Sequence, residues 1–234
     1  MEQNKTSKYF KYAIGEILLV VIGILIALQI NNWNEANKAV KIEQDYLTKL
    51  YADISDMNFI YASSSLEKFT AEIKEAEKAL KYVESNGEME DLKTAFENTL
   101  LTHQVLRSFI KSRSTYDEML TNGVLARVSN EELKMKITDV FDEIDLSNNY
   151  IPYFRDEVGR ASKIINEHVL FSYNKNSDLT VTYDINEFYS VKPFRNALVE
   201  IIDARKDYLR SAQIISLKIK EAKILLEKEL QLNQ

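Results

Sequence analysis

The sequence predicts an all-α protein in which an N-terminal transmembrane helix continues into an elongated up-down four-helix bundle with coiled-coil-like seams. Three observations lead to this prediction. Residues 17–30 are apolar except for Gly23 and Gln29, the chain of 234 residues has only five glycines and two prolines, and apolar residues further along recur at spacings of three and four. Turn-rich β architectures draw heavily on glycine and proline, whereas 3–4 spacing marks one face of a helix.

The apolar stretch is long enough to cross a lipid bilayer. Roughly 20 apolar residues, each rising about 1.5 Å, span the hydrocarbon core, and aromatic rings at both ends suit the headgroup layers. A cleavable secretory signal is the alternative, but it needs a shorter apolar core and a small-residue cleavage site. Residues 29–33 offer no such site. We therefore expect an uncleaved anchor over 12–33, a tail over 1–11 and one bundle domain over 34–234.

The region after the anchor predicts long helical packing up to Gly87. Two sets of apolar residues follow 3–4 spacing, and the second set is one residue out of phase with the first. This phase slip favours a straight bundle helix over a long supercoil. Asn86-Gly87 predicts its C-terminal stop. The sets are Leu47, Leu50, Ile54, Met57 and Tyr61, then Leu66, Phe69, Ile73, Ala76, Leu80 and Val83.

The middle of the chain predicts a second helix over 88–110, then two capped helices. Thr115 and Ser129 each precede a glutamate by three residues, which matches a capping box. The first of these helices is short and ends at Asn122-Gly123. The second is long, and Pro152 is expected to end or kink it near Tyr150 before it continues to residue 168.

The last third predicts a connection and one long helix. Residues 172–186 are expected to be non-helical, with Leu179–Tyr183 as an extended loop because a strand without a partner is unstable. Pro193 suits the start of the final helix. The apolar stripe of that helix is interrupted by Arg205, which we expect to extend to solvent or to pair with an acid.

Composition excludes several classes of function. A net charge of −6 disfavours nucleic-acid binding, and the absence of cysteine removes disulfides, thiolate metal sites and cysteine nucleophiles. A di-iron bundle needs a glutamate three residues before each of two histidines, but Leu100 and Ile165 stand there, before His103 and His168. We predict no metal, no cofactor and no enzymatic activity.

The candidate site residues lie within the anchor. Glu16, Gly23 and Ala27 fall near one helix face, and Gly23 and Ala27 form a small-xxx-small pair that lets two helices approach closely. We predict that this face mediates self-association or the docking of a partner membrane protein. Glu16 lies only about 6 Å from the expected interface, so extension of its carboxylate to the headgroups is favoured over a proton-relay role.

Two passages resemble a known family. YAIGEILLVVIGILIALQINNWNE, residues 12–35, and STYDEMLTNGVLARVSNEELKMKI, residues 114–137, resemble the recurring passages of an uncharacterised domain-of-unknown-function family of bacterial single-pass membrane proteins. The resemblance implies a mainly helical membrane-anchored protein of Gram-negative type. It implies no activity and no catalytic residues.

Function is expected to lie in protein–protein contact. The leading hypothesis is a scaffold or accessory subunit in the bacterial envelope; the alternative is a bundle that senses a small ligand and signals through a partner, because helical bundles often place ligand sites between helices. We expect contact with the lipid bilayer and either a homo-oligomer or a membrane partner. The lysines at 5, 8 and 11 favour a cytoplasmic N-terminus in the inner membrane and a periplasmic domain.

Overall fold

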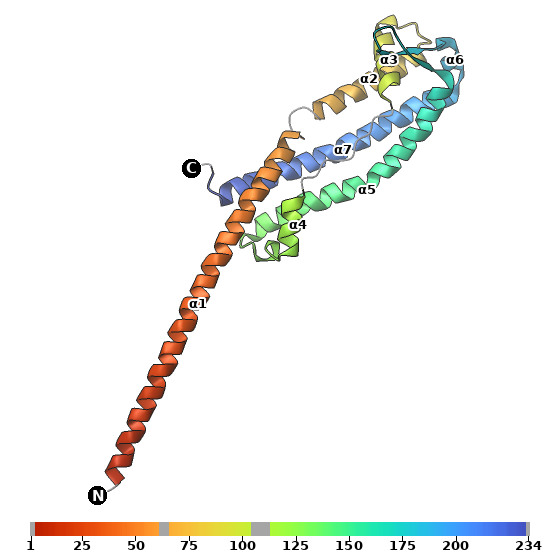
Figure 1. Ribbon diagram of the computed structural model, residues 1–234. Helices are drawn as coiled ribbons and strands as arrows, with labels where there is room; N and C mark the ends of the chain where they lie inside the picture. The colour runs from red at the N-terminus through yellow and green to blue at the C-terminus, as the bar shows by residue number, and fades with distance from the viewer. Residues whose placement is uncertain (1–2, 61–65, 104–112, 233–234) are drawn as a thin grey trace.

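A computed structural model describes residues 3–60, 66–103 and 113–232. Its first helix, α1 (Gln3–Ile60), runs without interruption from the apolar segment (residues 17–30) into the rest of the chain. Figure 1 shows α1 as a straight rod whose N-terminal half stands clear of all other elements. Asn31, Asn32 and Asn34 do not break this helix, although asparagine has low helix propensity.

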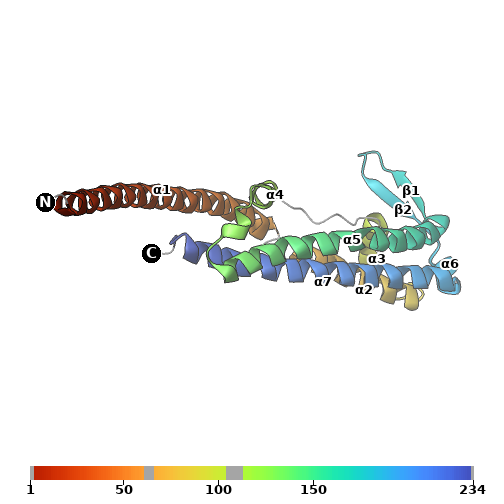
Figure 2. The same cartoon turned by 90° about the horizontal axis from the view of Figure 1, so that it is seen from below.

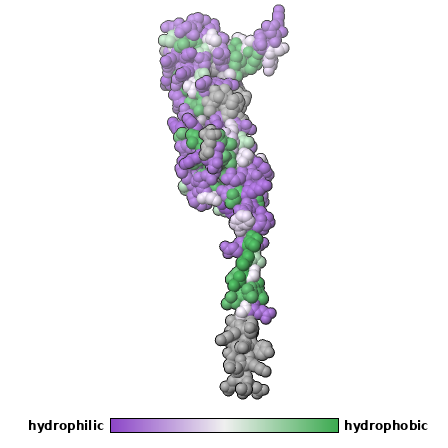
Figure 3. All heavy atoms as spheres, turned by 90° about the vertical axis from the view of Figure 1, so that its left-hand side faces the viewer, coloured by the Kyte–Doolittle hydropathy of each residue, from purple (hydrophilic) through white to green (hydrophobic). Residues whose placement is uncertain are grey.

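The apolar segment has no protein partner within the described chain. Its large side chains are between 43% and 70% exposed. It forms a hydrophobic band on the isolated rod, below a mainly hydrophilic body, in Figure 3. The helix that contains this segment is long and apolar enough to cross a membrane, judged by its length and composition.

The phase slip in the apolar pattern falls between the described parts of α1 and of the next helix. Helix α1 ends at Ile60 and α2 (Leu66–Glu84) begins six residues later, so the junction predicted to be helical lies outside the described residues. The stop after α2 is confirmed. Gly87 has a φ of +77° and donates its N–H to the carbonyl of Tyr82 at 3.0 Å, which satisfies an end carbonyl of the helix.

The second predicted helix begins later than the expected residue 88. A 3₁₀ turn, η2 (Glu90–Leu92), precedes α3 (Lys93–Thr102), and the predicted extension to residue 110 falls on residues that are not described. Helix α4 (Ser114–Thr121) ends before Gly123, as predicted, and the 3₁₀ turn η3 (Leu125–Arg127) follows.

Both predicted capping boxes are wrong. Thr115 lies inside α4, whose N-cap position is Arg113. The N-cap of α5 (Glu131–His168) is Asn130, whose side chain accepts from the N–H of Leu133. Ser129 lies one residue before this N-cap position, and its N–H and hydroxyl both donate to Glu43 of α1.

Two long antiparallel helices extend through the whole body. Helix α5 continues through Pro152, so the proline does not end the helix, and the helix curves gently along its length in Figure 1. Helix α7 (Lys192–Glu229) carries Pro193 in its first turn, as predicted. Every position of the predicted α7 stripe is buried, including Arg205.

The expected loop at 172–186 contains a strand that has a partner. Strands β1 (Leu170–Tyr173) and β2 (Leu179–Thr182) form an antiparallel hairpin, with Phe171 opposite Val181. The prediction of an unpaired loop was wrong because the partner strand directly follows α5 and was not recognised, its last two residues being counted as part of the connection. The short helix α6 (Ile185–Ser190) then leads into α7. Figure 2 shows the hairpin extending away from the far end of the bundle.

The body is an all-α bundle with two hydrophobic cores. The near core, toward the apolar segment, joins α1 and α4 to the first half of α5 and the last half of α7. The far core joins α2, α3 and α6 to the opposite halves of α5 and α7. Four helices therefore surround the near core and five surround the far core, and α7 contacts α1, α2 and α5. Arg205 lies on α7 between the two cores, at a level that we call the waist.

Candidate functional site: the joint between α1 and the body

The isolated part of α1 meets the body at one group of polar contacts, which we call the joint. It consists of α1 residues 43–51, the α4–α5 connection at 122–130 and the end of α7 at 223–229. The near core begins at Leu47 of α1, which is fully buried. Coming from the N-terminus, α1 therefore first contacts the body at the joint.

Glu43 makes the central contact of the joint. One carboxylate oxygen accepts from the N–H of Ser129 at 3.0 Å, and the other accepts from the Ser129 hydroxyl at 3.2 Å. Glu43 is only 9% exposed. A carboxylate so enclosed is stable only when its oxygens are hydrogen-bonded, so this glutamate fixes the α4–α5 connection against α1.

Asn130 connects the same point to α7. Its side-chain oxygen accepts from the N–H of Leu133 at 3.1 Å, and its side-chain nitrogen donates to Glu229 at 2.7 Å. One amide thus caps the start of α5 and holds the last turn of α7. The adjacent residues Ser129 and Asn130 therefore link α1, α5 and α7.

Two tyrosines of α1 complete the joint. The hydroxyl of Tyr46 accepts from the side-chain nitrogen of Asn122 at 3.1 Å, and the hydroxyl of Tyr51 donates to Glu227 at 3.1 Å. Lys223 pairs with Glu227 at 3.0 Å and lies over the Tyr51 ring, 5.8 Å from its centroid. Each ring packs against the near core while its hydroxyl makes the polar contact.

Sequence reasoning missed the joint, although one signal was present. Glu43 lies four residues before Leu47, so it continues backward the spacing of the seam that Leu47, Leu50 and Ile54 form. An acid at a seam position predicts a buried carboxylate that needs hydrogen-bond donors. The donors come from Ser129, 86 residues further on, and only the tertiary structure identifies them.

The predicted site residues of the apolar segment all lie on α1. Glu16 and Ala27 are exposed, and a β-carbon added to Gly23 would meet nothing within 4 Å. Helical spacing brings the three residues onto one side of the rod, since 16, 23 and 27 differ by close to whole numbers of turns. Within the described chain no other element contacts this face.

The two histidines and Arg205 each have hydrogen-bond partners within the body. His168 contacts Glu187 at 2.7 Å, and Nδ1–H of His103 donates to the carbonyl of Leu100 at 2.5 Å. Arg205 donates to the carbonyl oxygens of Glu72 and Thr102, at 3.3 and 2.8 Å. The prediction for Arg205 was wrong: its side chain is buried at the waist and bonds to backbone carbonyls, with no ion pair among the described residues.

The polar groups of the joint bond to one another across α1, α5 and α7. Its donors and acceptors satisfy one another and hold three helices at a fixed angle. Together, the fold and the joint define a helical protein whose exposed N-terminal helix is long enough to span a membrane.

The chain belongs to a family of unknown function, DUF6090, whose model matches residues 16–142, more than half of the chain. The matched part contains the apolar segment, the rod, Glu43 and the α4–α5 connection, and it stops soon after α5 begins. The chain matches no curated protein and no solved structure.

Proposed function

We propose that this protein is a membrane-anchored helical scaffold of the bacterial envelope, and that two copies pair through their apolar segments. The proposal is supported by an apolar rod without a partner in the chain and by a joint that fixes this rod to a rigid bundle. In this arrangement the bundle presents its outer faces to other envelope proteins at a set distance from the membrane.

The observation that carries the pairing is the direction of the Gly23 face (Glu16, Gly23, Ala27 and Ile30) relative to the body. Each of these residues precedes a buried, body-facing residue by 27 positions, which is about 7.5 turns of a helix. A half-integral number of turns places two residues on opposite sides of the axis. The four pairs are Glu16 with Glu43, Gly23 with Leu50, Ala27 with Ile54, and Ile30 with Met57.

This geometry permits parallel pairing without collision. If the Gly23 face were on the same side as the body, two rods in contact would force two bundles into the same space. Because it is on the opposite side, two rods pack through Gly23 and Ala27 while both bundles point outward. The arrangement is two-fold symmetric about an axis along the membrane normal, as expected for a self-complementary contact between tethered copies.

Single cysteines test the pairing directly, because the chain has none of its own. Asn34 lies about three turns after Gly23 on the same face, whereas Asn32 lies about 2.5 turns after it on the opposite side. We expect Asn34→Cys to form disulfide-linked dimers in membranes at least several-fold more efficiently than Asn32→Cys. Equal crosslinking at both positions would contradict the proposed face.

A bulk substitution provides the second test. Adding Gly23→Ile to the Asn34→Cys protein should abolish crosslinking because the side chain separates the two helices. The matched control is Val21→Ile, which adds one methylene group on the far side of the rod and should leave crosslinking intact. Unchanged crosslinking with Gly23→Ile would refute pairing through this face.

We further propose that the N-terminus is cytoplasmic and the bundle periplasmic, with the apolar segment in the inner membrane. Asn176 lies in the exposed hairpin turn, so a cysteine there should be reachable without disturbing the core. In intact cells with a permeable outer membrane, Asn176→Cys should react with a membrane-impermeant maleimide. Labelling only after the inner membrane is lysed would reverse the orientation.

A further inference from the structure

A stretch of α1 between the apolar segment and the body, residues 31–42, is covered by no other element of the described chain; we call it the stalk. Every stalk residue is exposed, and burial of α1 against the body begins at Glu43. Four of the first seven stalk residues are asparagines, which favour helix weakly. A helix of about 12–15 residues or fewer is only marginally stable in water without packing. Packing against a second helix would therefore stabilise the stalk.

The stalk continues the spacing of the Gly23 face. Beyond the apolar segment this spacing falls on Asn34, Asn37 and Lys41, at the intervals of three and four residues that mark a coiled-coil seam. Lys41 lies 18 residues after Gly23, which is five whole turns of a helix. The polar seam of the stalk is therefore on the same side of α1 as Gly23, opposite to the body.

An asparagine at this seam matches a second asparagine. With Gly23 at position d of the heptad, Asn34 occupies position a, where a single asparagine specifies the register and the number of strands in a coiled coil. Its amide carries both a donor and an acceptor, so two such amides facing each other across a two-fold axis can bond to each other. An apolar side chain at the same point of a partner would leave the amide without a bond, which costs free energy.

We propose that the stalk forms a parallel two-stranded coiled coil with the stalk of a second copy, and that Asn34 facing Asn34 makes the pairing specific for this chain. The inference rests on the pairing proposed above and extends it out of the membrane, by about 10 Å from Asn34 to Lys41. Two lysines at position 41 repel each other across the seam, so the coiled coil ends there. Two residues later Glu43 meets the body on the opposite side of α1.

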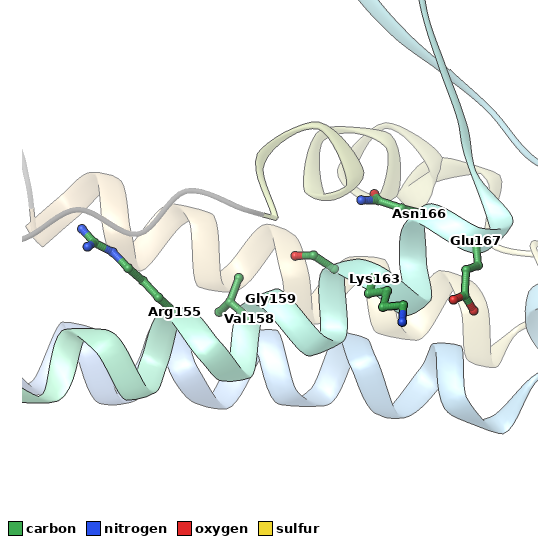
Figure 4. A pocket seen from close by; sticks show the side chains of 7 residues that line it. Arg155, Val158, Gly159, Lys163, Asn166 and Glu167 are labelled. Carbon is green, nitrogen blue, oxygen red and sulfur yellow. The ribbon is translucent and has the colours of Figure 1, made fainter.

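The second copy leaves the outer surface of the body uncovered, because it lies on the side of α1 that faces away from the body. One feature of that surface is a groove of about 660 Å³ on α5. Figure 4 shows it between Arg155 and Glu167, with Lys163 along its length. Lys163→Asp adds a carboxylate to this exposed surface and should leave pairing unchanged. Loss of pairing in Lys163→Asp would contradict the outward direction of the body.

Charge variants at residue 34 test the coiled coil in full-length protein, with two differently tagged copies expressed together. Asn34→Asp sets two carboxylates against each other, so co-purification of the two tags in mild detergent should fall several-fold. One Asn34→Asp copy with one Asn34→Lys copy sets opposite charges face to face and should restore co-purification. Asn32→Asp is the matched control, because the identical substitution lies on the opposite side of the stalk and should have no effect. Equal losses at residues 32 and 34, or no restoration by the mixed pair, would overturn the proposal.

Hydrogen exchange reports on the stalk helix itself. In Asn34→Asp the amides of residues 35–42 should exchange faster than in wild type, whereas Asn32→Asp, with the same change in helix propensity, should match wild type. Wild-type exchange in Asn34→Asp would refute the coiled coil. If Gly23→Ile leaves crosslinking at residue 34 unchanged, the pairing itself is wrong. If Gly23→Ile abolishes crosslinking while Asn34→Asp behaves like Asn32→Asp, only the coiled coil is wrong.

Discussion

Removal of the Glu43 carboxylate is the most direct test of the joint. Glu43→Ala deletes two hydrogen bonds to Ser129, at 3.0 and 3.2 Å. A hydrogen bond to a charged group contributes about 1.5–3 kcal/mol. Ser129 is itself exposed, so water can replace part of what its N–H and hydroxyl lose. We therefore expect a loss of about 2 kcal/mol in the free energy of unfolding, which is below the roughly 3–6 kcal/mol that two fully buried bonds of this kind contribute.

The loss should be visible in thermal melts followed by circular dichroism in detergent. For a domain of 150–250 residues, 1 kcal/mol corresponds to about 2–4 °C in Tm. Glu43→Ala should therefore lower Tm by about 4–8 °C. The matched control is Glu35→Ala on the isolated rod, where the side chain is 60% exposed and pairs with Lys38 at 2.9 Å. Such a surface pair contributes about 0–1 kcal/mol, so the control should melt within a few degrees of wild type.

The location of the effect distinguishes the joint from general destabilisation. In Glu43→Ala, hydrogen exchange should accelerate first at the α4–α5 connection, at the Ser129 amide, while amides of the far core keep wild-type protection. If Glu43→Ala melts like Glu35→Ala, or if exchange rises equally in both cores, Glu43 does not fix the body to α1 and the reasoning is refuted.

Two further predictions concern the far half of the body. Gly87→Ala should lower the free energy of unfolding by about 1–2 kcal/mol, because φ is +77° and a β-carbon would lie 3.0 Å from Cγ1 of Ile185. Gly159→Ala, at an open position inside a helix, should raise it by up to about 1 kcal/mol. Equal melting temperatures for the two variants would contradict this reasoning. His103 has a pKa lowered by burial, so the unfolded chain binds its proton more readily and stability is lost as pH falls below about 6.5. The stability advantage of wild type over His103→Gln should therefore shrink from pH 7.5 to 5.5 in paired melts, and a constant difference would exclude this role.

The joint and the waist show where sequence reasoning stops. Periodicity located the α7 stripe and the stops at Gly87 and Gly123, because these depend on spacing and local backbone conformation. The predicted partner of Arg205 and the predicted N-cap of α5 were wrong, because both depend on contacts between distant segments. Ser129 matched a capping box, yet Glu43 of α1 engages it and Asn130 caps the helix instead.

The hairpin shows the same division at the level of secondary structure. The alternation at Leu179–Tyr183 is strand-like, but the segment was wrongly predicted to be an extended loop because a strand is stable only beside a partner. That partner, Leu170–Tyr173, follows α5 without a turn signal of its own, and Phe171 packs against the far core. Burial of a side chain by distant helices therefore decided the conformation of this segment.

By itself, the sequence determined the helical class, the apolar segment and the residues that share each helix face, because each follows from composition and a fixed period of 3.6 residues. The tertiary structure alone decided that Gly23 and the body lie on opposite sides of α1, since this requires one unbroken helix from Gly23 to Leu50. It also decided which donors meet Glu43 and that Arg205 bonds to backbone carbonyls at the waist. Such contacts join residues far apart in the chain, and no local pattern encodes them.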